Sequence, residues 1–198
     1  MRRSPNHRDG ALRIGAVTYL NARPLVVGLA EALPDAAISF DLPSRLADQL
    51  AGGEIDIALA PCIELPEHPE WSTVSTACIG ARGPVLSVKL LFRTTADQVQ
   101  RLALDEGSRT SATLAQVLLA EKCGVRPRLE SLPIGASATD SSADAVLVIG
   151  DRAMAPAPDE FRESWDLGAA WREWTGLPMV FAMWMARPGV DGALLGDA

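Results

Sequence analysis

The sequence predicts an α/β fold of two similar lobes with a ligand cleft between them. Short apolar strands alternate with helical segments, a pattern typical of parallel sheets with helices on both faces. The order strand, polar loop, helix, strand, connector and Asp-containing apolar strand occurs twice. It ends first in "EIDIALAP" (54–61) and then in "SADAVLVIGD" (142–151). Because open α/β sheets bind ligands beyond the carboxyl ends of their strands, the cleft between the lobes is the expected site.

The first repeat contains three strands and two helices. Pro24 suits the first turn of the first helix, in which Gly28 is a mild defect. Ser44 is the predicted N-cap of the second helix, which stops at Gly52 and Gly53. The predicted elements are strand 12–17, polar loop 18–24, helix 25–33, strand 37–42, helix 43–53 and strand 54–61.

The second repeat has the same order but lacks one helix. Residues 133–143 are small and polar and show no helical face, so they are predicted to form a loop in place of a helix. The predicted elements are strand 86–94, helical turn 95–100, strand 101–105, polar loop 106–111, helix 112–124, extended segment 126–133 and strand 143–151.

A third segment returns the chain to the first lobe. It holds a short helix flanked by tryptophans (165–175) and an apolar strand (178–186), whose Trp and Met side chains are expected in the core. We expect lobe 1 to comprise residues 1–92 plus 185–198 and lobe 2 residues 93–184. The strands within 86–94 and 181–189 are expected to cross between the lobes.

The composition excludes several classes of function. The chain has 198 residues, is 48% hydrophobic and carries a net charge of −7, which argues against a nucleic-acid or anionic-membrane partner. Its three cysteines form no C-x-x-C or Cys/His spacing, so we expect reduced, mostly buried thiols and no metal site. The basic N-terminus is not followed by the apolar segment of about 7–15 residues typical of a signal peptide, and no apolar run approaches the ~20 residues that span a membrane. We therefore expect a cytoplasmic protein.

The stretch "DEGSRTSATL" (105–114) places hydroxyl and basic side chains at the start of a helix. The first backbone N–H groups of a helix are unpaired and carry partial positive charge, so they can hold an anion. Serine and threonine are also common N-caps, so a well-capped helix explains the same residues. The two interpretations are compatible, because a hydroxyl can cap the helix while the other N–H groups face a ligand.

Six segments occur in an order that resembles the chorismate dehydratase family of the futalosine route to menaquinone. The resemblance covers roughly residues 12–190 and implies the type II periplasmic-binding-protein fold, two lobes with the cleft at a two-stranded hinge. It favours the anion interpretation of the helix start and implies a small-molecule substrate, chorismate, with no cofactor. The segments are "RIGAVTYLNARPLVVGL", "LPSRLADQLAGGEIDIALAP", "GPVLSVKLLF", "LALDEGSRTSATL", "VLVIGD" and "WREWTGLPMVFAMWMARPG".

The resemblance also implies roles for individual residues. Asn21 and Ser87 would touch the reacting part of the substrate, and the helix start would hold a carboxylate. Arg109 could pair with a carboxylate or point to solvent, and Asp151 could bind a hydroxyl or cap a loop, with the structural role slightly favoured. The substrate-binding residues implied are Ser108, Arg109, Thr110, Ser111, Gly150 and Asp151.

No general base is evident in the cleft motifs. The two histidines, His7 and His68, lie in the N-terminal tail and in a proline-rich loop. This fits the substrate-assisted scheme that the resemblance suggests, in which a substrate carboxylate takes the proton and the protein supplies positioning and electrostatics.

Two other functions share this fold. One is a non-catalytic protein that binds a small anion, and the other is the later naphthoate-forming lyase of the same pathway, which would need a cleft histidine. The chain also departs from the family, whose members continue with further helices packed on lobe 1. We expect this chain to be C-terminally truncated, ending soon after residues 189–198 begin a helix.

Overall fold

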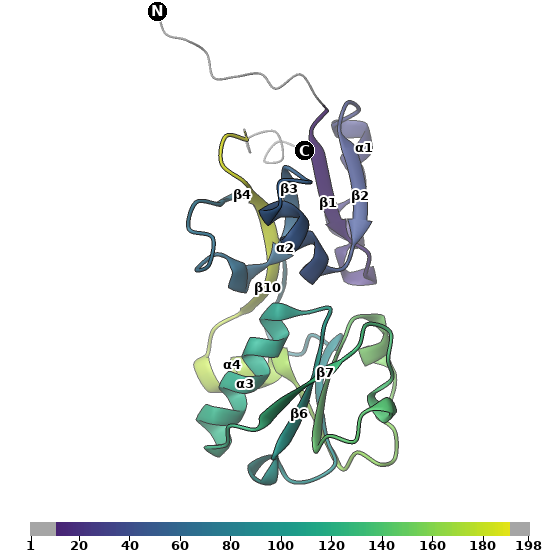
Figure 1. The fold of residues 1–198 in the computed structure, drawn as a ribbon, viewed down its shortest axis with the longest axis vertical. Coiled ribbons are helices and arrows are strands. Elements are labelled where there is room, and N and C mark those ends of the chain that lie inside the picture. The colour runs from purple at the N-terminus through teal and green to yellow at the C-terminus, as the bar shows by residue number, and fades with distance from the viewer. Residues whose placement is uncertain (1–10, 191–198) are drawn as a thin grey trace, which may run out of the picture.

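The computed structural model describes residues 11–190, which form two lobes, each around a five-stranded sheet (Figure 1). The sheet of lobe 1 has the strand order β2-β1-β3-β10-β4, and that of lobe 2 has the order β7-β6-β8-β5-β9. The strands are β1 (Arg13–Val17), β2 (Ala37–Asp41), β3 (Ile57–Pro61), β4 (Ser72–Ala81), β5 (Val88–Phe92), β6 (Arg101–Asp105), β7 (Arg128–Leu132), β8 (Ala145–Ile149), β9 (Glu163–Asp166) and β10 (Met179–Ala186).

Within residues 11–190, four α-helices and five short 3-10 helices connect the strands. The α-helices are α1 (Leu29–Ala32), α2 (Pro43–Ala51), α3 (Arg109–Cys123) and α4 (Leu167–Thr175). The 3-10 helices are η1 (Leu20–Leu25), η2 (Cys62–Glu64), η3 (Ala96–Gln98), η4 (Ala138–Asp140) and η5 (Asp151–Met154).

The two sheets have the same internal arrangement, which confirms the two predicted repeats. In each sheet three strands are parallel, β2-β1-β3 in lobe 1 and β7-β6-β8 in lobe 2. The fourth strand is antiparallel to the third, β10 against β3 and β5 against β8. The expectation of parallel sheets was therefore wrong for one strand in each sheet, because β10 in lobe 1 and β5 in lobe 2 run antiparallel to both of their neighbours.

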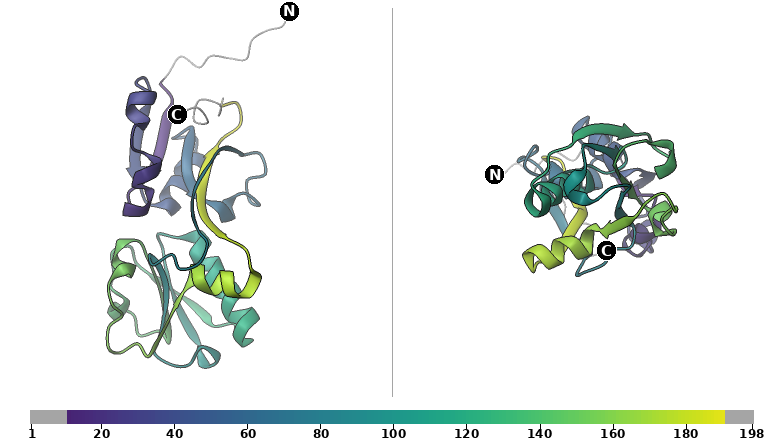
Figure 2. Two further views of the ribbon diagram at one scale, coloured as in Figure 1. Left: turned by 180° about the vertical axis from the view of Figure 1, so that it is seen from behind. Right: turned by 90° about the horizontal axis from the view of Figure 1, so that it is seen from below.

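The strands that join the lobes are β4 and β10. They pair antiparallel from Met179 opposite Ala81 onward, and Figure 2 shows β10 rising from lobe 2 into lobe 1. Phe181 of β10 packs in the core of lobe 2, whereas Trp184 packs in that of lobe 1. The strand predicted within 181–189 thus packs against both lobes, although it belongs to the sheet of lobe 1. The crossing predicted for 86–94 was wrong, because β5 lies wholly in the second sheet and β4, which was not predicted, takes its place.

Sheet membership differs from the lobe boundaries expected at residues 92 and 185. β5 belongs to the sheet of lobe 2, although it precedes residue 93, and all of β10 belongs to the sheet of lobe 1. We therefore propose boundaries in the two connections at residues 82–87 and 176–178, which flank these strands. The helix predicted to begin within 189–198 lies almost entirely outside the described residues, as does His7.

Two local predictions in the first repeat were wrong. The helix predicted over 25–33 is interrupted because Gly28 is left-handed (φ 83°), a conformation that glycine adopts without steric cost. Pro24 consequently lies inside η1 instead of opening a longer helix. Leu42, not Ser44, is the N-cap of α2, and Pro43 occupies the first helical position. The predicted end of this helix at Gly52 is confirmed.

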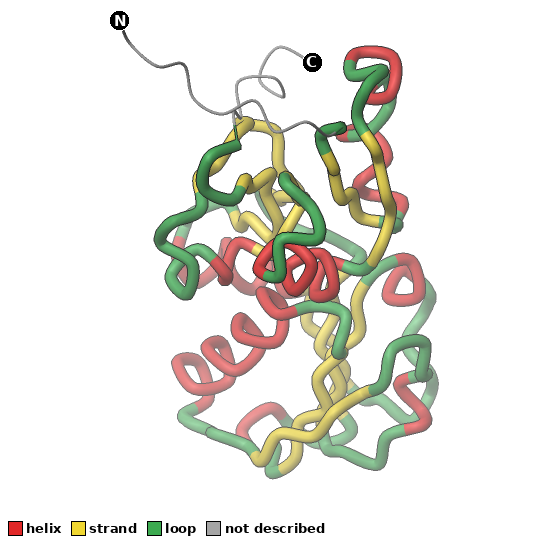
Figure 3. Tube along the Cα trace, turned by 45° about the horizontal axis from the view of Figure 1, so that its top comes forward, coloured by secondary structure: helices red, strands yellow, loops and turns green. Residues whose placement is uncertain are grey.

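Lobe 2 is covered differently on its two faces. One face packs against α3 and α4 through a cluster that includes Leu114, Leu118 and Leu167. The other face packs against loops and 3-10 turns through a cluster that includes Leu91, Leu132 and Ala138. Figure 3 shows these loops beside the strands of lobe 2. The predicted loop over 133–143 is thus confirmed apart from the short η4, and helices do not cover both faces of this sheet.

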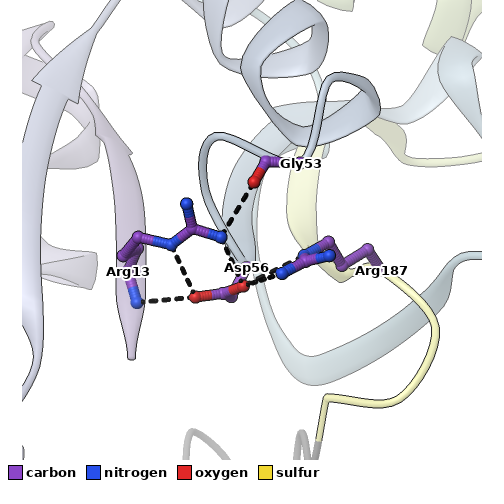
Figure 4. Close-up of polar contacts among 4 residues, drawn as sticks. All are labelled: Arg13, Gly53, Asp56 and Arg187. Carbon is purple, nitrogen blue, oxygen red and sulfur yellow. Dashed lines mark hydrogen bonds and ion pairs between the residues drawn. The ribbon is translucent and has the colours of Figure 1, made fainter. Parts of the chain in front are cut away.

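A cluster of charged residues links three segments of lobe 1 (Figure 4). Asp56, just before β3, accepts from the backbone N–H and Nε of Arg13 at 3.0 Å and from Nε of Arg187 at 3.0 Å. Arg13 also donates to the carbonyl of Gly53 at 2.8 Å. Burial alone would raise the pKa of Asp56, but the hydrogen bonds from the two arginines outweigh it and hold that pKa well below its usual value. The cluster joins β1, β3 and the end of β10.

Among the described residues, none of the helices is both long and apolar enough to cross a membrane.

Candidate active site

A cleft lies between the lobes where the parallel strands of both sheets end. Val17 and Pro61 close β1 and β3 in lobe 1, and Ile149 closes β8 in lobe 2. The space amounts to about 440 Å³, counting the part open to solvent. Its lining residues are Val17, Tyr19, Asn21, Pro43, Pro61, Ile79, Val85, Ser87, Val88, Ser108, Ser111, Ile149, Gly150, Phe181 and Ala182. The site is where sheet topology predicts it.

The start of α3 supplies two of the predicted residues to this cleft. Ser108 is the N-cap, and its Oγ accepts from the backbone N–H of Ser111 at 3.2 Å. The hydroxyl of Ser108 donates to Oγ of Ser111 at 2.8 Å. Both side chains are buried, so this helix start combines capping with a polar surface toward the cleft. The first backbone N–H groups of α3 are free of intrahelical acceptors, as at any helix start.

Asp105 fixes the loop that leads into α3. Its side chain is buried, and its carboxylate accepts from the backbone N–H of Gly107 at 2.9 Å and of Ile149 at 3.3 Å. Arg152 pairs with the same carboxylate. The loop between β6 and α3 is therefore tied to the end of β8, which keeps the helix start in place beside the cleft.

Arg109 and Thr110 point away from the cleft and contact lobe 1. The guanidinium of Arg109 lies 2.6 Å from Asp48 and 3.0 Å from Glu64. Burial lowers the pKa of Arg109, but these two carboxylates raise it above its usual value. Oγ1 of Thr110 accepts from the backbone N–H of Ile63 at 3.4 Å. Neither residue lines the cleft, so the structure gives both a role in joining the lobes.

Ser87 and Gly150 lie side by side at the lobe 2 wall. The backbone N–H of Gly150 donates to the carbonyl of Ser87 at 2.8 Å, and both residues are buried. The Ser87 hydroxyl has one long contact, 3.4 Å to the carbonyl of Val85, which leaves it available to a ligand. Asn21 faces them from η1 of lobe 1 and is exposed. The cleft thus brings together Asn21, Ser87, Gly150 and the start of α3.

Asp151 is a contact between the lobes and does not line the cleft. Its carboxylate accepts from the backbone N–H of Leu20 at 3.2 Å. A second contact of this kind joins the backbone N–H of Ser44 to the carbonyl of Gly107 at 3.4 Å. For Asp151 the structure supports the structural role that the sequence slightly favoured.

Tyr19 lines the cleft and was missed by the sequence analysis. It packs against the cores of both lobes, and its ring lies directly over Gly150. Burial, with a further contribution from Asp105, raises the pKa of Tyr19 to about 12, so its hydroxyl stays a hydrogen-bond donor at neutral pH. The residue stands in the quoted "YLN" segment, but no sequence pattern distinguished it from a core aromatic.

The cleft lining contains no acidic, basic or histidine side chain in the described part of the chain. His68 lies elsewhere, stacked on Trp71 with ring centroids 3.9 Å apart. Residues 11–190 also hold no group of three or more Cys, His, Asp or Glu side chains placed to bind a metal ion. What the cleft offers a ligand is a set of neutral donors around a helix start.

Comparison with known proteins assigns the family. The sequence model of a family described as "Menaquinone biosynthesis" matches residues 12–196. The chain belongs to the menaquinone-biosynthesis family. A relative within it is the chorismate dehydratase of Thermus thermophilus, which is 30% identical over 191 residues, covering 88% of this chain and 69% of the relative. The resemblance inferred from the six sequence segments is confirmed.

Solved structures place this menaquinone-biosynthesis family member among the two-lobed binding-protein folds. A protein from Archaeoglobus fulgidus superposes with a TM-score of 0.72 at 14% identity, covering 96% of this chain and 72% of that protein. The alkanesulfonate-binding protein SsuA from Xanthomonas axonopodis pv. citri, bound to MOPS, superposes with a TM-score of 0.55 at 16% identity, covering 92% and 67%. These likenesses show the fold, which is the periplasmic-binding-protein-like fold predicted from the sequence.

Proposed function

We propose that this protein is a chorismate dehydratase, a hydro-lyase that converts chorismate to 3-[(1-carboxyvinyl)oxy]benzoate in menaquinone biosynthesis. The observation that carries the proposal is the cleft itself, in which neutral donors surround a helix start and no histidine or carboxylate is present among the described lining residues. A lining of neutral donors suits a dianionic substrate in which one carboxylate acts as the base. The similarity to the Thermus thermophilus enzyme supports the same activity.

The reaction needs one proton and one hydroxyl to leave the ring. The side-chain carboxylate of chorismate takes the proton from the ring carbon that bears the enolpyruvyl ether. The ring C–O bond then breaks, the C–H electron pair completes the aromatic ring, and the proton and the departing hydroxide form one water. Aromatisation drives the reaction, so the protein has to orient the groups and lower the barrier.

The polar side chains of the cleft each have a task in this scheme. The start of α3, with Ser108 and Ser111, holds a carboxylate through its backbone N–H groups and hydroxyls. Ser87 donates to the leaving hydroxyl or to the carboxylate, because its own hydroxyl has only one long contact. Asn21 orients the ring substituents from lobe 1. Tyr19 adds a protonated hydroxyl to the lobe 1 wall.

The experiment is to incubate the purified protein with chorismate and to follow the ultraviolet spectrum. We expect the cyclohexadiene absorption to be replaced by that of an aromatic product whose mass is lower by one water. Ser87→Ala should abolish most of this change. A protein that binds chorismate, as judged by a rise in melting temperature, but leaves its spectrum unchanged would be a non-catalytic binder. The later naphthoate-forming lyase would also leave chorismate unchanged.

The proposal includes a cytoplasmic location. All three cysteines, Cys62, Cys78 and Cys123, are free thiols, which suits a reducing compartment. All three are partly buried, whereas the sequence analysis expected mostly buried thiols. Burial raises the pKa of Cys62, so this thiol stays protonated and is a poor nucleophile at neutral pH.

A further inference from the structure

The cleft continues outward into a second, more polar hollow at its mouth. The two share Asn21, Ile79, Val85 and Ser87. The outer hollow is lined by the end of β4 and by the connection between β4 and β5, residues 82–87. It therefore extends the substrate site toward solvent along the hinge between the lobes.

Arg82 is the one charged side chain among the described residues that line the inner cleft and this outer hollow. It is exposed, and no carboxylate of residues 11–190 lies within 4.0 Å of its guanidinium. Two other arginines, one in the first turn of α3 and one that contacts the end of β6 before it, are already paired. Arg109 is paired with Asp48 and Glu64, and Arg152 with Asp105. Among the described lining side chains, Arg82 is thus the cation available to a ligand.

The connection that carries Arg82 is held rigidly. The backbone N–H groups of Val85 and Leu86 donate to the carboxylate of Asp166 at 2.7–3.0 Å, and Asp166 in turn caps α4. Gly83 is buried, and its carbonyl packs so closely on Gly168 that an added Cβ there would lie 2.5 Å away. Ser87 stands at the inner end of this connection and Arg82 at the outer end. A fixed backbone therefore presents a neutral donor to the inner cleft and a cation to its mouth.

A dicarboxylate in the cleft needs partners for two negative charges. The start of α3 can hold one carboxylate, but the inner lining has no cation for the other. We propose that Arg82 binds the second carboxylate of the substrate at the mouth of the cleft and so selects dicarboxylates over monocarboxylates. This inference rests on the proposed function for the identity of the substrate, but it can be tested without turnover. An arginine suits the task because its guanidinium can grip a carboxylate with two parallel hydrogen bonds.

The test compares two aromatic probes that differ in one carboxylate, 3-(carboxymethoxy)benzoate and 3-methoxybenzoate. Their dissociation constants are measured by calorimetry for the wild-type protein, Arg82→Gln, Arg82→Lys and Arg162→Gln. Arg162 is exposed and directly precedes Glu163, the residue of β9 that pairs with Phe92 at the end of β5. Its replacement controls for the loss of one positive charge.

Arg82→Gln should weaken binding of the dicarboxylate on the order of 10-fold, as expected for a charge-assisted hydrogen bond near solvent. Binding of the monocarboxylate should not change. Arg82→Lys should restore part of the loss, and Arg162→Gln should match the wild type for both probes. The dicarboxylate preference should shrink as salt is added. Equal weakening of both probes by Arg82→Gln, or of neither, would overturn the assignment.

The chorismate assay separates this inference from the proposed function. If the wild type forms no aromatic product but Arg82→Gln still weakens binding of the dicarboxylate probe alone, the assignment of Arg82 stands and the proposed dehydratase activity is refuted. If the wild type dehydrates chorismate and Arg82→Gln keeps its KM, the activity stands and the assignment of Arg82 fails.

Discussion

Replacing Gly150 with alanine tests whether the two lobes must meet closely over the cleft. Gly150 has φ 72° and ψ −158°, a region that essentially only glycine occupies, so a side chain there costs about 1–3 kcal/mol. The added Cβ would also lie 2.6, 2.8 and 2.9 Å from three ring atoms of Tyr19. To reach 3.4 Å, where ordinary contact begins, the nearest ring atom must retreat by 0.8 Å, the difference between 3.4 and 2.6.

This retreat should affect activity more than stability. Tyr19 packs on both lobes, so moving it displaces the lobe 1 wall relative to Ser87 and the start of α3. A displacement of this size can cost roughly 10²-fold in rate, and we expect kcat/KM for chorismate to fall by about that factor. The backbone strain should lower the melting temperature by roughly 2–12 °C for a protein of this size.

Gly135→Ala is the matched control. Gly135 also has a positive φ (84°), but an added Cβ there meets nothing within 4 Å. It should lower the melting temperature through the cost of the left-handed conformation, about 1–2 kcal/mol, and leave kcat/KM unchanged. Thermal denaturation and steady-state kinetics measure both effects. If Gly150→Ala has the same kcat/KM as Gly135→Ala, the contact between Tyr19 and Gly150 does not position the cleft residues, and the reasoning is refuted.

Four further predictions use single substitutions. Ser87→Ala should lower kcat for chorismate by roughly 10²–10³, the scale for losing one preorganised donor, and an unchanged kcat would remove Ser87 from the mechanism. Ser111→Ala should mainly raise KM, because the backbone N–H groups of α3 remain to hold the carboxylate. His68→Ala should leave turnover unchanged, and a large loss would require a search for a protein base. Asp56→Asn should lower the free energy of unfolding by about 3 kcal/mol, the low end for removing one partner of a buried ion pair, since Arg13 is partly exposed. Because folding lowers the pKa of Asp56, its stabilisation is present above the ordinary value of 3.8 and is lost as the pH falls through the folded value. Acid unfolding curves should therefore show a weaker pH dependence in Asp56→Asn than in the wild type.

The repeated arrangement of strands and helices could be predicted because both signals are local. Buried strands such as β6 and β8 are short apolar runs, and their bounds agree with prediction within two residues. The end of α3 at Gly124, which is left-handed (φ 70°), follows the known preference of helix ends for glycine. These elements are determined by hydrophobic periodicity and by local backbone geometry, and both can be recognised from consecutive residues.

The hinge strand β4 could not be predicted in the same way. Its burial pattern has no clean alternation, and many of its residues are small, polar and partly exposed. It is a strand because it pairs with β10, which lies about a hundred residues later along the chain. Pairing partners at this separation give no local signal, and the same is true of the antiparallel direction of β5 and β10 in their sheets.

The incomplete prediction of the site has a related cause, visible at the start of α3. Ser108 and Ser111 face the cleft, whereas Arg109 and Thr110, between them in the chain, contact Asp48, Glu64 and Ile63 of lobe 1. A helix turns about 100° per residue, so neighbours in one turn must face different surroundings. Both surroundings are polar, since the first is the proposed carboxylate site and the second presents the carboxylates of Asp48 and Glu64 and the backbone N–H of Ile63. The residue types were therefore informative about polar contacts at this turn but not about which partner each one meets. Because the same turn joins the lobes and lines the cleft, the proposed carboxylate site at Ser108 and Ser111 depends on the contacts that Arg109 and Thr110 make with lobe 1.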